Sequence, residues 1–500
     1  MPRSLLFLYI ILTIFLTVGV VAFVLHATHA FKTDSELDYG EGVVLWQAAN
    51  VTNWKKAFRP VEEYPHIVFH YPPLFHLTSR ALARVTSTLL QAGRLTSILS
   101  SIGTFLICAL LTLWAAPPGR SRFPGFIGAF TAGTLVFTTP IWWWGVFMRV
   151  DALAIFLTVA GVALFVLSRR RPALAFLAFV LFVAAVYTKQ TSFAGPIACF
   201  AIAFIEKPRR ALQLLFFSTA LGLVLLWSLY NATDGLILRH LITYNQNPYF
   251  PEQIFIRLRY HGADVLGPLV FSALFPIALL WRRKSRLVTR LRIILNRTRF
   301  ERSVLVVAVY FWTTTFIAAA TISKQGASDN YFLEMDIVAC WLNGLFVVWL
   351  ARRMSFKPRR AFVALQVVVI VVLLVQCGFG WHKVAEIFLT YQYPVIDRSH
   401  DVVNFIKTLP GPVYSEDMVI LVQAGKEIPA EPAIISALAE DGKWDESGFV
   451  ARIRNAEFDA VVIRWTLQNP QRFREPIANA IEERYLMIND FYPFKVYLPR

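Results

Sequence analysis

The sequence contains few cysteines and few acidic residues for its length. Only four of its 500 residues are cysteine, namely Cys108, Cys199, Cys340 and Cys377. All four lie in or beside apolar runs, and none has the spacing of metal ligands, so we predict neither a disulfide framework nor a cysteine metal site. Charged residues make up only 16% of the chain, and 32 Asp and Glu stand against 49 Lys and Arg, which gives a net charge of +17.

Apolar residues take the place of the missing charges. They make up 56% of the chain, and the mean hydropathy is +0.53, well above that of soluble globular proteins. Many apolar runs are long enough to cross about 30 Å of hydrocarbon. The sequence therefore predicts a polytopic α-helical membrane protein with about 11 spans. We expect the spans near residues 5–25, 95–115, 124–141, 151–168, 173–188, 193–205, 211–230, 264–281, 303–321, 333–350 and 361–380.

Two features of these runs need interpretation. The first run is longer than the apolar core of a signal peptide, and no small-residue cleavage site follows it, so we predict a retained span. The runs 173–188 and 193–205 are short, and they form either two short spans or one re-entrant pair, which must then be buried in protein.

Basic residues predict the orientation of the chain. Lys and Arg concentrate in alternate connections, most strongly in 282–302, and such connections face the cytoplasm. This puts the N-terminus inside. It puts the first loop (26–93) and the segment after the last span outside. We find no basic soluble module, so the positive charge does not predict a nucleic-acid partner.

Composition also suggests where the domains lie. Residues 1–380 form the predicted transmembrane domain. Charged residues return in 381–500, where short strand-like runs alternate with helical ones, which predicts an extracytoplasmic α/β domain. In the first loop, Gly42–Asn50 and Leu77–Leu90 are amphipathic, and we expect helices lying in the membrane interface.

The first loop opens with four acidic residues: Asp34, Glu36, Asp38 and Glu41. Transfer of a group to a hydroxyl requires a base, and a carboxylate in a partly dry site is suited to that task. Asp38 and Glu41 are three residues apart, so they would share one face at the start of a helix. The alternative is that these residues cap the next helix and face water.

Further polar residues occur at the predicted outer ends of spans. Arg149 and Asp151 could bind and orient a phosphate, or they could form a salt bridge at a helix end. Lys189 and Gln190 lie in a tight turn, where the lysine either neutralises a phosphate or extends to the surface.

A second group of such residues comes from two segments, 70–76 and 323–334. The segment S-K-Q-G-A-S-D-N-Y-F-L-E mixes cation, amide and carboxylate groups, which suits sugar binding. In the motif H-Y-P-P-L-F-H, either His70 and Tyr71 line a cavity or the two prolines form a structural turn. Charges at membrane depth usually mark a functional path, so clusters at one level predict a shared outward-facing cavity. The candidate binding residues in these motifs are His70, Tyr71, Lys324, Asn330, Tyr331 and Glu334.

The order of these motifs resembles the GT-C superfamily of integral membrane glycosyltransferases, in the branch of protein O-mannosyltransferases and aminoarabinose transferases. The motifs are D-Y-G-E-G at 38–42, H-Y-P-P-L at 70–74, R-V-D at 149–151, T-K-Q-T at 188–191 and N-Y-F-L-E at 330–334. The resemblance covers about residues 25–380 and, more loosely, the C-terminal α/β region. It departs from the common pattern, because the first-loop Asp and Glu of the family are adjacent.

The resemblance implies a function and its partners. The donor would be a polyprenyl-phosphate-sugar, the acceptor a glycan, lipid or protein hydroxyl, and Asp38 the base, with Glu41 next. It also implies a bacterial inner membrane. No metal site is apparent from spacing, although a divalent metal is possible. Two alternatives remain: a transporter or flippase of lipid-linked sugars, and a non-catalytic assembly subunit. Charges at span ends and the lack of an internal repeat favour the enzyme over the transporter.

Overall fold

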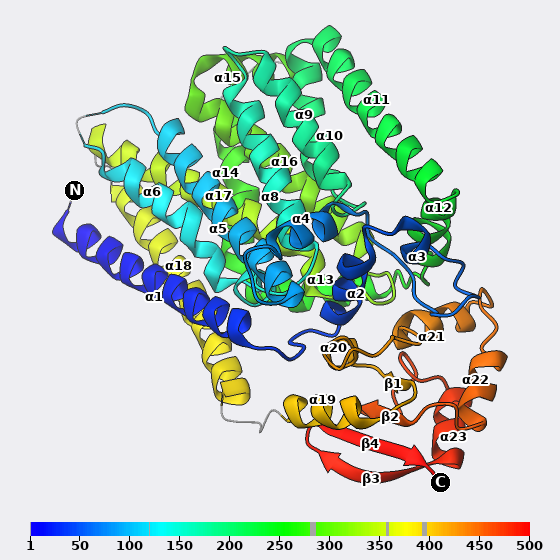
Figure 1. Cartoon of the computed structure of the whole chain (residues 1–500). Coiled ribbons are helices and arrows are strands. Elements are labelled where there is room, and N and C mark those ends of the chain that lie inside the picture. Colours follow the sequence, from blue (N-terminus) through cyan, green and yellow to red (C-terminus); the bar gives the residue numbers. More distant parts are fainter. Residues whose placement is uncertain (1, 120, 281–286, 357–359, 393–397) are drawn as a thin grey trace.

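The computed structural model describes residues 2–119, 121–280, 287–356, 360–392 and 398–500. A large helical bundle carries a small α/β region at one end (Figure 1). Parts of the predicted basic segment (281–286) and of the C-terminal domain (393–397) lie outside the described residues. The elements of the bundle and its loops are α1 (Arg3–Lys32), α2 (Gly40–Asn50), α3 (Trp54–Ala57), α4 (Leu74–Leu82), α5 (Leu89–Ala115), α6 (Phe123–Thr134), η1 (Leu135–Thr138), α7 (Ile141–Trp144), α8 (Asp151–Leu167), α9 (Ala173–Val186), α10 (Ala194–Glu206), α11 (Pro208–Ala232), α12 (Leu236–Leu241), η2 (Thr243–Asn245), α13 (Gln253–Asp264), α14 (Leu266–Leu280), α15 (Leu287–Arg297), α16 (Arg299–Thr321), η3 (Asp329–Tyr331), α17 (Leu333–Phe356) and α18 (Arg360–Gln392).

The structure does not confirm the predicted number of about 11 membrane spans. Among the described residues, six helices are long and apolar enough to cross a membrane: α1, α5, α11, α16, α17 and α18. The count rises to seven if α13 and α14, which meet at an angle of 96°, form one broken span. The apolar segments at 123–138, 151–167, 173–186 and 194–206 are shorter, with 10–17 residues each. Short helices suffice where neighbouring protein covers their ends.

Small residues let the central helices approach closely. α6 and α17 cross where Gly128 faces Gly344, and a Cβ on Gly344 would lie 2.5 Å from the carbonyl oxygen of Gly128. Only glycine permits this separation, which is typical of helix pairs in membranes. Trp341 of α17 is fully buried, so α17 forms the centre of the bundle.

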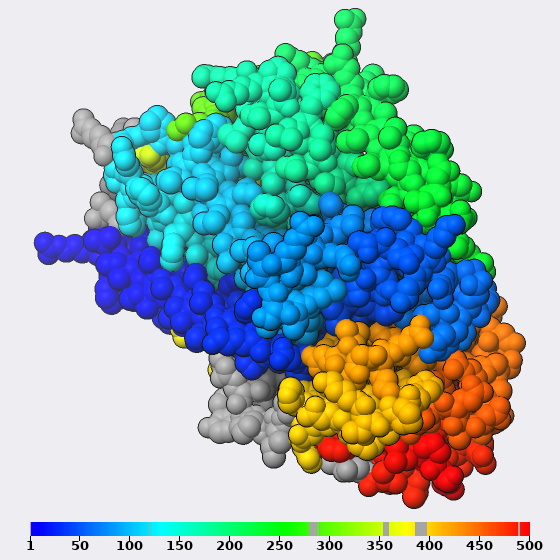
Figure 2. All heavy atoms as spheres, viewed as in Figure 1, coloured from blue at the N-terminus to red at the C-terminus, as the bar shows by residue number. Residues whose placement is uncertain are grey.

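The helix α2 differs from the expected interfacial helix. Residues 40–48 of α2 are all buried, because α2 packs against α4 and α5 on one side and against α20 of the C-terminal region on another. An amphipathic pattern predicts burial on one face only, and the second partner removes the exposed face. In Figure 2 the first loop lies directly against the C-terminal region.

The C-terminal region confirms the predicted alternation of strands and helices. Its strands form one sheet in the order β1-β2-β4-β3, in which β1 and β2 are parallel and the other pairs antiparallel. The strand β2 is buried at all four positions. The elements are α19 (Ser399–Thr408), β1 (Val413–Ser415), α20 (Met418–Gln423), α21 (Pro432–Glu440), α22 (Ser447–Arg454), β2 (Ala460–Ile463), α23 (Glu475–Arg484), β3 (Tyr485–Phe491) and β4 (Phe494–Pro499).

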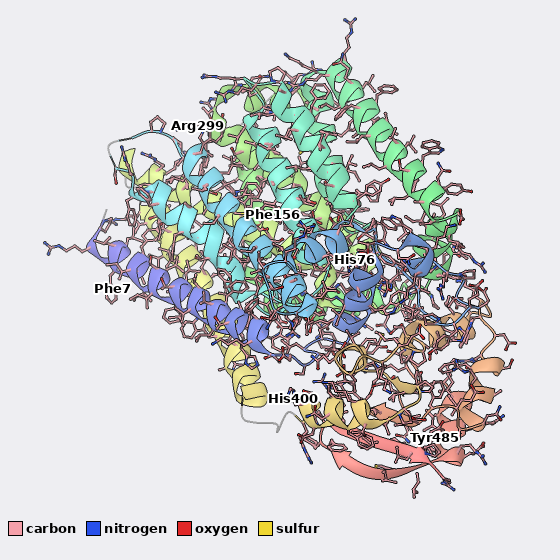
Figure 3. All side chains as sticks on the ribbon, in the orientation of Figure 1. Phe7, His76, Phe156, Arg299, His400 and Tyr485 are labelled. Carbon is pink, nitrogen blue, oxygen red and sulfur yellow. The ribbon has the colours of Figure 1, made fainter. Side chains whose placement is uncertain are left out.

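The two ends of the bundle differ in their surroundings. Arg299, at the start of α16, lies at the end far from the C-terminal region, whereas His400 and Tyr485 belong to that region (Figure 3). His76 of the first loop lies between the bundle and the C-terminal region. The helix α18 continues past Gly380 to Gln392, so the last long helix extends beyond the predicted domain boundary.

Candidate functional site

A cavity of about 520 Å³ lies where the bundle, the first loop and the C-terminal region meet. This volume is within the range typical of small-molecule sites. The bundle and its loops contribute Arg149, Lys189 and Lys324, and the first loop contributes His70 and Tyr71. Gln190 and Tyr331 also line the cavity. Seven of the residues singled out from the sequence therefore share one space, although they come from four separate segments.

Asp38 lies next to this cavity in an ion pair. Arg149 Nη1 is 2.9 Å from Asp38 Oδ2, and the two side chains are 16% and 20% exposed. The same carboxylate oxygen accepts the backbone N–H of Gly40 at 3.1 Å. A Cβ on Gly40 would lie 1.4 Å from Nη1 of Arg149, so glycine at this position makes room for the guanidinium. Asp38 itself does not line the cavity, whereas Arg149 does.

Opposing effects act on these two side chains. Burial raises the pKa of Asp38, and the charge of Arg149 lowers it in part, leaving the pKa above its usual value. Burial lowers the pKa of Arg149, but the negative charge of Asp38 raises it by more, so the guanidinium stays charged. The pair therefore combines a fixed cation with a carboxylate that takes up a proton more readily than one in water.

Lys189 forms a second buried pair. Its Nζ lies 2.6 Å from Asp151 Oδ1 and 4.7 Å from the centre of the Tyr331 ring. Asn330 donates to the same oxygen of Asp151 at 3.2 Å. The lysine is only 13% exposed, so it does not extend to the surface. Arg149 and Asp151 do not pair with each other, because each takes a partner from another segment.

The H-Y-P-P motif forms a turn, and its residues His70 and Tyr71 also line the cavity. The carbonyl of His70 accepts hydrogen bonds from Gln190 at 3.0 Å and from Asn245 at 2.9 Å, which tie three segments together. Burial lowers the pKa of His70 to about 3, so its ring is neutral at ordinary pH. Lys324 Nζ donates to the carbonyl of Asn245, and burial lowers the pKa of this lysine.

Glu41 has a different role from the one expected. Its carboxylate is fully buried and holds Arg94 through two hydrogen bonds, of 2.8 and 2.6 Å. It also accepts the backbone N–H of Met148 and of Leu37, each at 2.8 Å. Asp38 and Glu41 turn toward different arginines, so they do not share a face. Glu41 has no access to the cavity, and it stabilises the first loop.

The remaining candidate residues do not line the cavity. Asp34 is exposed, which agrees with the water-facing alternative. Glu36 is buried and accepts the backbone N–H of Gly42 at 3.0 Å, as a helix cap does. Glu334, Asn330 and Asp151 are not among the lining residues, and Glu334 accepts a hydrogen bond from the Tyr310 hydroxyl within the bundle.

Several lining residues were not expected from the sequence. Tyr39 lies in the D-Y-G-E-G motif but was not among the candidate residues, and Tyr244 and Asn245 belong to no motif. Glu431 and Arg472 come from the C-terminal region. The only signal for Tyr39 was its place beside Asp38. For Glu431 and Arg472 the sequence offers no signal, because nothing in the local pattern indicates which loops of the C-terminal region face the bundle.

The chemistry of the cavity favours an anionic ligand without a metal ligand set. Among residues 2–119, 121–280, 287–356, 360–392 and 398–500, no three His, Cys, Asp or Glu side chains group closely enough to hold a metal ion. The cations Arg149 and Lys189 are each held by one carboxylate. Such fixed cations in a partly dry cavity suit a phosphate group.

Comparison with known proteins identifies the fold. No protein-family model matches the sequence, and no curated protein matches it. A solved structure of ArnT from Cupriavidus metallidurans bound to undecaprenyl phosphate matches with a TM-score of 0.59 and 12% sequence identity, over 97% of each chain. The archaeal oligosaccharyltransferase AglB from Archaeoglobus fulgidus, in complex with an inhibitory peptide and a dolichol-phosphate, matches with a TM-score of 0.54 and 12% identity.

These matches extend over nearly the whole molecule. The AglB match covers 100% of this chain and 74% of that chain. At such low identity the likeness concerns the fold alone: the chain shares the fold of the ArnT and AglB structures, in agreement with the resemblance that the sequence motifs suggested. Together with its long apolar helices, this fold makes the chain an integral membrane protein.

Proposed function

We propose that this protein is a membrane glycosyltransferase that moves a sugar from a polyprenyl-phosphate-linked donor to an acceptor hydroxyl on the extracytoplasmic side. The observation that supports this most directly is the cavity lined by Arg149 and Lys189. Each of these cations is held by a carboxylate behind it, Asp38 for Arg149 and Asp151 for Lys189. The fold adds support, because one structure that shares it holds undecaprenyl phosphate and another holds dolichol-phosphate.

The donor phosphate would bind at the two cations. The phosphodiester of the donor carries one negative charge, as a carboxylate does, and it gains a second charge as the sugar leaves, so it competes with Asp38 for the guanidinium of Arg149. Lys189 would contact the phosphate while Asp151 and Asn330 hold the lysine in place. Lys324 lies on the same cavity wall and adds a third cation. Cations that bind the phosphate more tightly as it leaves lower the barrier.

Asp38 would then act as the base. The acceptor oxygen attacks the anomeric carbon of the sugar as the bond from that carbon to the phosphate oxygen breaks. The bonding electrons leave with the polyprenyl phosphate, and Asp38 takes the proton of the acceptor hydroxyl. Because the phosphate draws Arg149 away, Asp38 would lose its ion pair as the donor binds. Its raised pKa then favours proton transfer.

The lipid tail would occupy an apolar cavity beside Lys189. This cavity has a volume of about 360 Å³ and is lined almost entirely by apolar side chains of α9, α10 and α11. Tyr187 and Phe193, which flank the turn of Lys189, both line it. A lipid there would leave its phosphate near the lysine. The acceptor would then approach from the opposite wall, which the C-terminal region forms.

The test is a transfer assay in reconstituted vesicles with radiolabelled polyprenyl-phosphate sugars. We expect the wild-type protein to move label onto an acceptor and Asp38→Asn to reduce turnover by about 10²–10⁴-fold, the range of general base catalysis. Asp34→Asn is the matched control, because Asp34 is exposed and outside the cavity. Movement of the lipid-linked sugar across the vesicle membrane without sugar transfer would contradict the proposal and support a flippase.

A further inference from the structure

Tyr39 joins the candidate base to the C-terminal region. It stands between Asp38, which pairs with Arg149, and Gly40, whose Cα approaches the same guanidinium. The side chain of Tyr39 points the other way. Its hydroxyl donates to the carboxylate of Glu431. The two residues are 392 positions apart in the sequence, so this contact connects the first loop with a distant part of the chain.

Two more contacts fix the same ring. The backbone N–H of Ala433 donates to the Tyr39 hydroxyl oxygen at 3.1 Å, and the guanidinium of Arg472 lies 3.9 Å from the ring centre. Arg472 is itself held by Glu416 at 2.6 Å. A guanidinium over the face of an aromatic ring is attracted to it. Tyr39 is therefore held at its hydroxyl and over its face by groups that belong only to the C-terminal region.

On one side, the backbone next to Tyr39 is held by the C-terminal region. Arg464 donates to the carbonyl of Glu36 at 2.8 Å, and Gln423 donates to the carbonyl of Asp34. On the bundle side, Arg149 and Arg94 hold Asp38 and Glu41. The segment 34–42 thus lies between two bodies, and the position of the Asp38 carboxylate depends on both.

We infer that the C-terminal region positions Asp38 through Tyr39, so that Tyr39, Glu431 and Arg472 are positioning residues for the transfer reaction. The inference rests on the proposed function of Asp38. A shift of about 1 Å in a reacting group can cost about 10²-fold in rate. Rotation of the Tyr39 backbone moves its neighbour Asp38 by that order, and the three contacts prevent such rotation. The C-terminal region then contributes to catalysis by holding Asp38 in place, in addition to lining the cavity.

The test compares two arginines that both stack on first-loop tyrosines. Arg472 covers Tyr39, and Arg452 covers Tyr64 at 4.7 Å. Tyr64 and Arg452 do not line the cavity, so Arg452→Gln is the matched control for Arg472→Gln. Tyr39→Phe is the mildest variant, because it removes the two hydrogen bonds and keeps the ring. It also guards against misfolding of Arg472→Gln, which leaves the buried Glu416 without its arginine.

Two measurements separate positioning from other roles. In transfer assays we expect Tyr39→Phe to lower kcat about 10- to 100-fold and to change the KM for the acceptor by less than about twofold. Hydrogen–deuterium exchange then follows the amide of Gly40, which donates to Asp38. We expect faster exchange in Tyr39→Phe and Arg472→Gln, and unchanged exchange in Arg452→Gln.

The outcomes distinguish this inference from the proposed function. An unchanged exchange rate at Gly40 in Tyr39→Phe would overturn the positioning role. So would a raised acceptor KM at constant kcat, which indicates that Tyr39 binds the acceptor directly. If the wild-type protein transfers no sugar from any donor, the proposed function fails, and the exchange measurement alone decides whether Tyr39 holds the Asp38 segment.

Discussion

At the scale of single residues, the roles proposed for Asp38 and Arg149 predict the pH range of activity. Burial raises the pKa of Asp38, and the charge of Arg149 lowers it. Transfer requires the ionised carboxylate, whose fraction increases as the pH rises through its pKa. Arg149→Gln removes the lowering effect, so we expect the acid limb of kcat/KM to move to higher pH. A pH profile in vesicles measures this. An acid limb of Arg149→Gln at the same pH as in the wild-type protein would show that a group other than Asp38 controls this limb.

Glu41 and Arg94 provide a second prediction, on stability. Burial alone would raise the pKa of Glu41, but the charge of Arg94 and two backbone N–H groups hold it below its usual value. The pair therefore stabilises the fold above the unfolded pKa of Glu41, and this contribution is lost as the pH falls through the folded pKa. Glu41→Gln leaves Arg94 buried without its charge partner.

We expect Glu41→Gln to destabilise the protein by about 3–5 kcal/mol, seen as a lower Tm in detergent. The exposed pair Arg239–Glu62 is the control, because its side chains are 43% and 48% exposed, and Glu62→Gln should cost no more than about 1 kcal/mol. Equal Tm values for the two variants would show that the Glu41 pair is not structurally important.

The residues themselves could be predicted from the sequence better than their partners. The first-loop acids and the cations of T-K-Q-T and R-V-D were recognisable, because charges are rare in this chain and cluster at the ends of apolar runs. The partner of Arg149 was not recognisable, since Asp38 is 111 residues away, whereas Asp151 is only two residues away in the motif. Local spacing favours the near partner, whereas the fold selects the far one.

At the scale of elements, the start of α2 controls the geometry of the site. Gly40 is the first residue of α2, and a Cβ there would lie 1.4 Å from Arg149 Nη1. Gly40→Ala would displace the guanidinium and break its pair with Asp38. We expect at least a tenfold loss of transfer, of the order that misplaced catalytic groups produce, while the protein remains folded and inserted.

The control for this prediction is another helical glycine. Gly448 lies in α22, and a Cβ there has open space around it, so Gly448→Ala should leave transfer unchanged. Full activity in Gly40→Ala would mean that Arg149 can move aside without consequence, and that its contact with Asp38 is not required.

The sequence predicts elements with long apolar runs, but it does not predict how an element buried between the bundle and the C-terminal region is packed. The helices α1 and α5 follow directly from hydropathy. The helix α2 was assigned to the interface because its pattern is amphipathic, and α20 covers its remaining face. The strand β3 (Tyr485–Phe491) was not expected, since it pairs only with β4 at the sheet edge and lacks the buried run of a central strand.

At the scale of the whole molecule, the site requires the first loop and the C-terminal region to face the same side of the membrane. Asp34, in the first loop, and Ser447, in the C-terminal region, are both exposed. All four native cysteines are buried. We expect Asp34→Cys and Ser447→Cys to react with a membrane-impermeant maleimide in intact cells. Arg209→Cys, in the first turn of α11, should react only after permeabilisation.

Labelling at Asp34→Cys and Ser447→Cys from opposite sides would contradict both the topology and the shared cavity. The positive-inside pattern predicts one orientation, and the fold brings the first loop and the C-terminal region together (Figure 1). These are independent arguments, one from charge and one from packing. The labelling experiment therefore tests the sequence and the structure at once.

The cavity wall at residues 470–472 has a consequence for biosynthesis. A membrane protein is inserted segment by segment from its N-terminal end, so every long apolar helix enters the bilayer before this wall has been made. The newly inserted chain therefore passes through a period in which its cations are already in place and its chamber is still open. On the proposed function, we expect activity to begin only after the C-terminal region has folded onto the first loop.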